Sequence, residues 1–246
     1  NIAGGVTVSG GGAVRVFFID GGTVTMNRVT VTNGSAASGA GLTNYGALTL
    51  IDSAITGNTA TSTNGGGISN SGDLTLNHVI ISGNHAPAAG GGGGIYNNAS
   101  RLVIRNSTIS NNTSGNTGGG VALWGGVQSI TNTTLAGNSA LRGGGIDIIG
   151  GTSLTLENST LFGNSATGGS GTGNGGGIHV SGTVTIKSST LSGNSANGRG
   201  GGIYSNSNGP NLSNTIVAGN TAPLPNHANT SGVAPTGSNN LTSGDP

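Results

Sequence analysis

The chain has 246 residues, of which 53 are Gly, 3% are aromatic and 5% are charged. Seven Lys and Arg against six Asp and Glu give a net charge of +1, and no basic run is present that would neutralise a row of phosphates, so a nucleic-acid partner is not expected. The absence of Cys excludes disulfides and thiolate metal sites, and no apolar run is long enough to predict a transmembrane helix.

Two sequence patterns recur along the chain with one period. An Asn that closes a tight turn recurs at intervals of 26 to 30 residues, at Asn58, Asn84, Asn112, Asn138, Asn164, Asn194 and Asn220. The aliphatic residue that ends each glycine run recurs at nearly the same interval, from Leu42 to Ile203. Because the two patterns share a period of about 26 residues, we interpret them as one structural repeat.

Alternating apolar and polar residues predict short β-strands within each repeat. In chain order, a partial repeat around residues 6–8 precedes Phe18, from which we count about eight turns. Each turn is expected to hold three short strands that pair in parallel with those of the next turn, about 4.8 Å away. The sequence therefore predicts an all-β fold, a parallel β-helix, and the preference of parallel crossovers makes it right-handed.

Stacking places equivalent residues of successive turns in columns. One column is expected to point inward: Met26, Leu50, Leu76, Ile104, Ile130, Leu156, Ile186 and Leu212. Its neighbour is expected to point outward: Thr25, Thr49, Thr75, Val103, Ser129, Thr155 and Thr185. The turn asparagines are expected to form a ladder of side-chain amides, as is a second column of turn residues: Asp52, His78, Asn106, Asn132, Asn158, Ser188 and Asn214.

The repeats occupy residues 1–220, and the pattern fades in residues 221–246, which hold four of the six prolines. We predict that this tail is a terminal cover or linker. No polar capping repeat is recognisable before the first turn. Rods are therefore expected to associate end to end into filaments, or to continue into the β-helix of a longer parent chain.

The repeats read GGGI followed by LTLxNSTISGNSA, and they resemble the β-helical repeats of large bacterial secreted and cell-surface proteins. They are similar to the GGA[ILV] and FxxN repeats of polymorphic outer-membrane autotransporter passengers. The resemblance covers residues 14–220, with Gly in place of Ala in the glycine run and Leu, Ile or Val where that family often has Phe. It implies a β-helix that is secreted or on the cell surface, and no single activity.

One column contains a candidate ligand-binding patch. Asp147, His179 and Tyr204 each follow the first aliphatic residue after a glycine run, so they are expected to be outward neighbours on three successive turns. The longest inserted bend, residues 165–174, lies just before His179 and is placed to overhang them. The patch is interpreted either as a small carbohydrate-binding or acid/base site, or as a solvent-facing column that tolerates any polar residue.

The remaining ionisable residues do not form a recognisable site. The acids are dispersed over different columns, so we expect no enzyme and assign no catalytic residue, and the four His are too scattered for a metal site. No cofactor is expected. The leading interpretation is an extracellular structural or adhesive rod, a filament subunit in one form, with surface glycans as candidate partners. The alternative is a carbohydrate-binding β-helix or a polysaccharide lyase or hydrolase, and ice binding ranks third because Val103 interrupts the outward Thr/Ser column.

Overall fold

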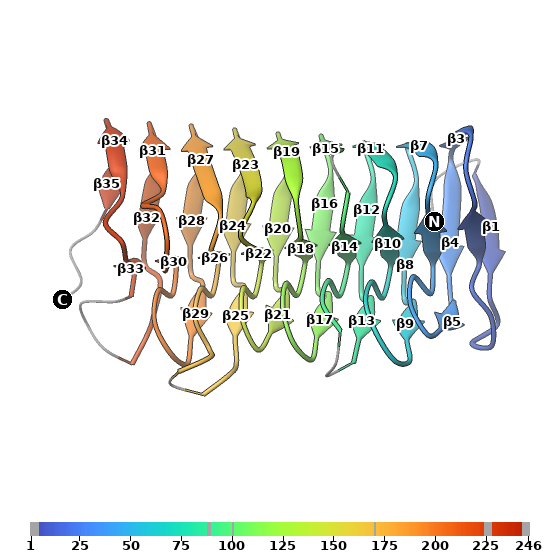
Figure 1. The fold of residues 1–246 in the computed structure, drawn as a ribbon, viewed down its shortest axis with the longest axis horizontal. Coiled ribbons are helices and arrows are strands. Elements are labelled where there is room, and N and C mark those ends of the chain that lie inside the picture. Colours follow the sequence, from blue (N-terminus) through green and yellow to red (C-terminus); the bar gives the residue numbers. More distant parts are fainter. Residues whose placement is uncertain (1–4, 88–89, 100, 170, 224–227, 243–246) are drawn as a thin grey trace.

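The structure is a computed structural model that describes residues 5–87, 90–99, 101–169, 171–223 and 228–242. Its strands stack coil upon coil along one axis, with β1 (Val6–Ser9) at one end and β35 (Leu241–Thr242) at the other (Figure 1). Every strand pair is parallel. The described residues contain no helix, and therefore none that could cross a membrane. The fold is the predicted β-helix.

Each coil passes through three principal sheets. Sheet A contains β1, β4 (Val29–Thr32), β8 (Ala54–Thr56), β12 (Ile80–Ser82), β16 (Thr108–Ser110), β20 (Thr134–Ala136), β24 (Thr160–Phe162), β28 (Thr190–Ser192), β32 (Ile216–Ala218) and β35. Sheet B contains β2 (Phe17–Ile19), β6 (Leu42–Asn44), β10 (Ile68–Asn70), β14 (Ile95–Asn97), β18 (Val121–Leu123), β22 (Ile146–Ile148), β26 (Ile178–Val180), β30 (Ile203–Ser205) and β33 (Thr230–Gly232). Sheet C contains β3 (Thr23–Asn27), β7 (Ala47–Ile51), β11 (Asp73–Asn77), β15 (Arg101–Arg105), β19 (Gly126–Thr131), β23 (Thr152–Glu157), β27 (Thr183–Lys187), β31 (Asn211–Ser213) and β34 (Thr236–Ser238).

A fourth, narrow sheet lies after the turn asparagines and was not predicted from the sequence. Sheet D contains β5 (Ser35–Ala36), β9 (Thr59–Ala60), β13 (His85–Ala86), β17 (Thr113–Ser114), β21 (Ser139–Ala140), β25 (Ser165–Ala166) and β29 (Ser195–Ala196). Strands of two residues are too short to show an alternating pattern, so the sequence carries no periodic signal for them.

The interior is the predicted aliphatic column. From Leu50 to Leu212 its members are at most 1% exposed, and Met26 packs against them at the first coil. The neighbouring Thr/Ser column is half-buried or exposed as expected, apart from Val103, which is 6% exposed. Each short strand therefore points alternate side chains into the core and to the surface.

The turn asparagines form a continuous buried ladder. From Asn58 to Asn194, Nδ2 of each Asn donates to Oδ1 of the Asn one coil later at 2.9–3.0 Å, and the backbone N–H donates to the same oxygen. Gly34 N–H begins the ladder on Oδ1 of Asn58, and Asn229 accepts the last bond from Asn220 at 3.0 Å. The positive φ of these turns is carried by the preceding residue, for example Gly57. The amides are thus free to point inward, and the predicted ladder is confirmed.

The prediction of a second ladder, in the column from Asp52 to Asn214, is wrong, because these side chains do not form a continuous row of hydrogen bonds. All seven of its residues have φ between +46° and +60°, a conformation in which the side chain turns towards solvent. Only isolated contacts link them, such as Asn132 Nδ2 to Asn106 Oδ1 at 3.2 Å. A different, shorter ladder is instead buried at the end of sheet B, where Asn44, Asn70 and Asn97 are joined at 2.7 and 2.6 Å.

The tail differs from the predicted boundary at residue 220. Strands β33, β34 and β35 pair in register with β30, β31 and β32, and they complete about nine coils where eight were counted. Apart from the exposed Leu241, their side chains are polar or small, so the sequence lacks the aliphatic alternation that marks the earlier coils. Backbone pairing and the bond from Asn220 to Asn229 hold this last coil in place.

Candidate functional site

The three residues of the predicted patch do lie side by side. Asp147 of β22 is in register with His179 of β26, and His179 is in register with Tyr204 of β30. The expectation that the patch faces solvent is wrong for two of them, because Asp147 is 0% exposed and His179 is 2% exposed. Only Tyr204 is partly exposed.

The glycine runs explain why this column is covered. Each run folds back over the strand that it precedes, so its backbone approaches the first outward side chain closely. Gly143 has φ +62°, and a Cβ there would lie 2.8 Å from Cβ of Asp147; Gly175 has φ +71°, and a Cβ there would lie 2.6 Å from the backbone nitrogen of His179. Only glycine permits this approach. The alternation along the strand predicts to which face a side chain points. Whether that side chain is buried depends on the path of the glycine run that covers it.

Asp147 is held by two cationic or proton-donating groups. Nη2 of Arg142 lies 3.1 Å from Oδ2 and Nε lies 3.3 Å from Oδ1, which is a two-pronged contact. Nδ1 of His179 lies 2.8 Å from Oδ1, although this contact lacks the alignment of a good hydrogen bond. Burying a carboxylate is costly unless it is paired in this way. The three residues therefore form one polar network beneath the surface.

A partly enclosed pocket of about 300 Å³ opens above this network. Gly171, Thr172 and Asn174 of the inserted bend line it, so the predicted overhang is confirmed. The ring of Tyr204 stacks on that of His179, with centroids 5.4 Å apart and planes inclined by 21°. Arg142, Thr117 and the exposed Asn206 complete the polar lining: Oγ1 of Thr117 is buried and has no hydrogen-bond partner within the described part of the chain.

Sequence reasoning missed Arg142 and Thr117, whereas Asn174 belongs to the predicted overhang. All three occupy the position immediately before a glycine run, in the coils of β22, β18 and β26. Residues at the same position of successive repeats form a column. Their shared position before a glycine run could therefore have identified these residues from the sequence. The three side chains line the pocket from one side, while His179 and Tyr204 line it from sheet B.

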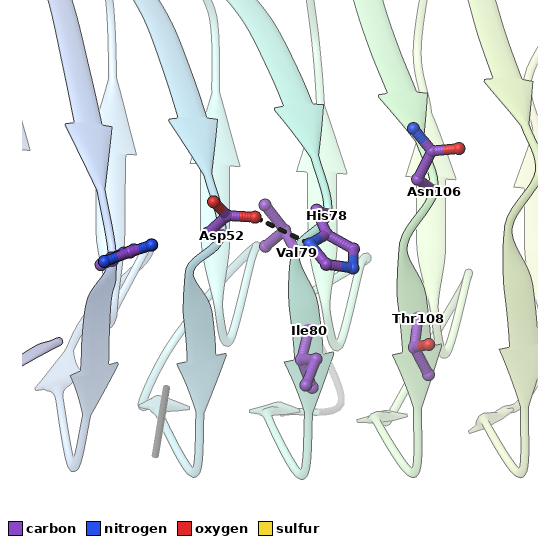
Figure 2. Close-up of a pocket in the computed structure, with 7 residues that line it drawn as sticks. Asp52, His78, Val79, Ile80, Asn106 and Thr108 are labelled. Atoms are coloured by element: carbon purple, nitrogen blue, oxygen red, sulfur yellow. Dashed lines mark hydrogen bonds and ion pairs between the residues drawn. The ribbon is translucent and has the colours of Figure 1, made fainter. Parts of the chain in front are cut away.

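A second Asp–His pair lies in a more open groove of about 510 Å³. Figure 2 shows Asp52 and His78 pointing towards each other from neighbouring coils, with Nδ1 and Oδ1 2.7 Å apart. The side chain of His78 is 74% exposed and that of Asp52 is 37% exposed. An exposed pair of this kind contributes little to stability, and no loop encloses a ligand above it. We therefore take the pocket at His179 as the better candidate site.

The site fits small polar ligands better than metal ions. In the described ranges, no three His, Cys, Asp or Glu side chains come together as metal ligands. Of the carboxylates in those ranges, only Asp147 belongs to the pocket network, and both of its oxygens are already engaged. What remains for a ligand is an aromatic face, an imidazole edge, amides, a hydroxyl and part of a guanidinium group.

The family described as "Right handed beta helix region" matches residues 3–161, well over half of the chain. No curated protein and no solved structure matches the chain significantly. The family match agrees with the handedness predicted from parallel crossovers and with the stacked coils of the structure. The chain belongs to the right-handed β-helix family.

Proposed function

We propose that this protein is a rigid surface rod that binds carbohydrate in the pocket above Asp147 and His179. The single observation that carries the proposal is a partly enclosed polar pocket built on the buried Asp147–His179 pair and on Arg142, whose side chain is 34% exposed. Burying charged and polar groups costs free energy of folding. Polar clusters of this kind are often found at functional sites.

The lining favours a sugar over other small ligands. A sugar ring presents an apolar C–H face and a rim of hydroxyls, which suit the Tyr204 ring and the surrounding amide and hydroxyl groups respectively. Arg142 is neutralised by Asp147, so the pocket offers no free cation of the strength that a phosphate ligand requires. The near-zero net charge of the chain points in the same direction.

Binding is preferred over hydrolysis because a second carboxylate is missing from the pocket within the described residues. Glycoside hydrolysis uses two carboxyl groups about 5 to 9.5 Å apart. Of the other acids of the described chain, Asp73 and Glu157 lie in sheet C, and Asp20 and Asp52 lie in the turns that follow β2 and β7. One observation does favour an enzyme as the second candidate: Asp147 beside His179 is the arrangement that orients an imidazole as a general base.

The proposal is tested by screening the intact chain against immobilised neutral and acidic glycans, followed by titration of any hit. Tyr204→Ala removes the aromatic face and is expected to weaken binding about ten-fold. Phe162→Ala is the matched control, because Phe162 is an exposed aromatic residue (56%) of sheet A, away from the pocket. Loss of binding in both variants, or in neither, contradicts the proposal.

The same glycans, incubated with the protein and analysed for released products, decide between binding and turnover. Product release that is abolished by His179→Gln would show that the protein is an enzyme.

Surface location and end-to-end association, both expected from the sequence, stay predictions. Electron microscopy of native material distinguishes single rods from continuous fibres.

A further inference from the structure

Most of the few aromatic side chains lie on one face of one sheet. The chain has three Phe, three Tyr and one Trp, and five of these share the outer side of sheet B. They are Phe18, Tyr45, Tyr96, Trp124 and Tyr204. Of the other two, Phe17 packs against the core and Phe162 lies in sheet A.

These residues occupy two parallel columns. Phe18, Tyr96 and Tyr204 belong to the column that contains Asp147 and His179. Tyr45 and Trp124 form a second column two residues further along each coil, just beyond the ends of β6 and β18, where ring contacts hold them against Phe18 and Tyr96. That second column also contains Ser71, Asn98 and Asn206, all exposed, and Asn206 lines the pocket at His179.

The rings form pairs at a regular interval. Phe18 and Tyr45 lie 5.7 Å apart, Tyr96 and Trp124 lie 6.1 Å apart, and His179 and Tyr204 lie 5.4 Å apart, measured between ring centroids. Each pair joins two neighbouring coils, and the pairs begin at β2, β14 and β26, three coils apart. At about 4.8 Å per coil, the interval is roughly 14 Å.

Three of the rings are largely exposed, Tyr96 and Tyr204 are half-buried, and His179 is buried. Phe18 is 53% exposed, Tyr45 is 55% exposed and Trp124 is 44% exposed. A hollow of about 280 Å³ lies beside Trp124, lined by Ser71 and Asn98. Burial raises the pKa of the half-buried Tyr96 hydroxyl above its ordinary value of 10.0, so this hydroxyl remains a hydrogen-bond donor near neutral pH. Single exposed aromatics need no explanation, but a set gathered along one face marks a binding surface.

We infer that the outer face of sheet B is an extended binding track for a linear neutral polysaccharide that lies along the rod axis and enters the pocket at His179. This inference rests on the proposed carbohydrate function and extends it from one sugar subsite to a polymer. Aromatic pairs, one T-shaped, one tilted and one stacked, alternate along the track with hydroxyl and amide side chains, which suits the apolar faces and hydroxyl rims of successive sugar rings.

The charges on this face select a neutral chain. From β6 to β18 the two columns contain only Thr, Ser, Asn, Ala, Tyr and Trp. At the β2 end Arg15 lies over the Phe18 ring and Asp20 is exposed, one group of each sign, so neither an acidic nor a basic polymer finds a row of complementary charges. Asn206, a member of the second column, also lines the pocket. Three pairs spread over eight coils span roughly 35 Å, a distance that calls for a polymer rather than a disaccharide.

The test uses cello-, xylo- and manno-oligosaccharides, each as the disaccharide and as chains long enough to span three coils. Long chains are expected to bind more tightly than the disaccharide and to change the fluorescence of Trp124, the single Trp of the chain. Trp124→Ala and Tyr45→Ala are expected to weaken binding of long chains about three- to ten-fold while leaving the disaccharide unaffected. Phe162→Ala is the control for both ligands.

The outcomes separate the track from the pocket. Disaccharide binding that depends on Tyr204, without any gain for long chains, overturns the track and leaves the proposed function standing. Long-chain binding that depends on Trp124 and Tyr45 but not on Tyr204 supports the aromatic track, and it overturns both the entry of the chain into the pocket and the proposed function. If none of the three series binds and the Trp124 fluorescence is unchanged, the neutral-polysaccharide track is overturned, and the glycan screen alone decides the proposed function. Thermal melting of each variant verifies that exposed rings, not the fold, were altered.

Discussion

Nδ1 of His179 lies 2.8 Å from Oδ1 of Asp147, and both side chains are buried. His78 and Asp52 make a contact of almost the same length, 2.7 Å, at the surface. The two pairs contain the same residue types on neighbouring coils, yet they differ in what surrounds them. Solvent screens the exposed pair, whereas Arg142 and the glycine run enclose the buried one.

This difference predicts unequal costs for removing the two carboxylates. Asp147→Ala leaves Arg142 and the buried His179 without their partner and is expected to destabilise the fold by about 2 to 4 kcal/mol. Asp52→Asn is the control, because Asn tolerates the φ of +46° at this position, and it is expected to cost less than about 1 kcal/mol. Urea unfolding midpoints measure both, and equal shifts would contradict the burial of the Asp147 network.

The buried Asn ladder predicts a large effect from a single amide. Oδ1 of Asn138 accepts from both the backbone N–H and Nδ2 of Asn112, so Asn138→Ala leaves two buried donors without a partner. We expect a loss of about 2 to 4 kcal/mol. Asn132→Gly is the control, because Asn132 is exposed and its φ of +50° suits glycine. Comparable melting temperatures for the two variants would mean that the ladder does not stabilise the rod.

The direction of the strand side chains is tested at two adjacent residues of β19. Ile130 is fully buried, so Ile130→Asp places an unpaired charge in the interior, and it is expected to abolish the folded far-ultraviolet circular dichroism spectrum. Ser129, which points outward, should accept Asp with a change below about 1 kcal/mol. If Ile130→Asp has the same melting temperature as the parent chain, the assignment of Ile130 to the interior is wrong.

The glycine run above the pocket predicts that one methyl group disturbs the site. Gly143→Ala places Cβ at 2.6 Å from the carbonyl oxygen of Ile146, in a conformation that Ala rarely adopts. We expect a loss of stability of at least about 1 kcal/mol together with weaker glycan binding. Gly151→Ala is the control: its φ is +83°, but a Cβ there meets nothing within 4 Å, so only the conformational cost applies.

The coils, the core column and the Asn ladder could be predicted because they are periodic. A repeat fixes the register, and the register alone is enough to bring Asp147, His179 and Tyr204 together on neighbouring coils. Their burial could not be read from alternation, since it depends on how each glycine run folds over the strand that follows it. Arg142 was overlooked because it lies next to Asp147 only after that fold-back.

The last coil escaped prediction for a different reason. Strands β33 to β35 contain Gly232 and Gly237 with positive φ and few aliphatic residues, so neither the hydrophobic pattern nor the glycine run of the repeat is present. Their position is set by backbone pairing with the preceding coil, which depends on the neighbouring strands being present rather than on side-chain periodicity.

The central claim is that the pocket between Tyr204 and the bend at residues 171–174 holds a sugar. A crystal structure of the chain grown with a saccharide from the glycan screen tests it most directly. We expect a sugar ring against the face of Tyr204, with hydroxyls within hydrogen-bond distance of Asn206 and His179. A saccharide bound elsewhere on the rod while this pocket contains only water would contradict the account.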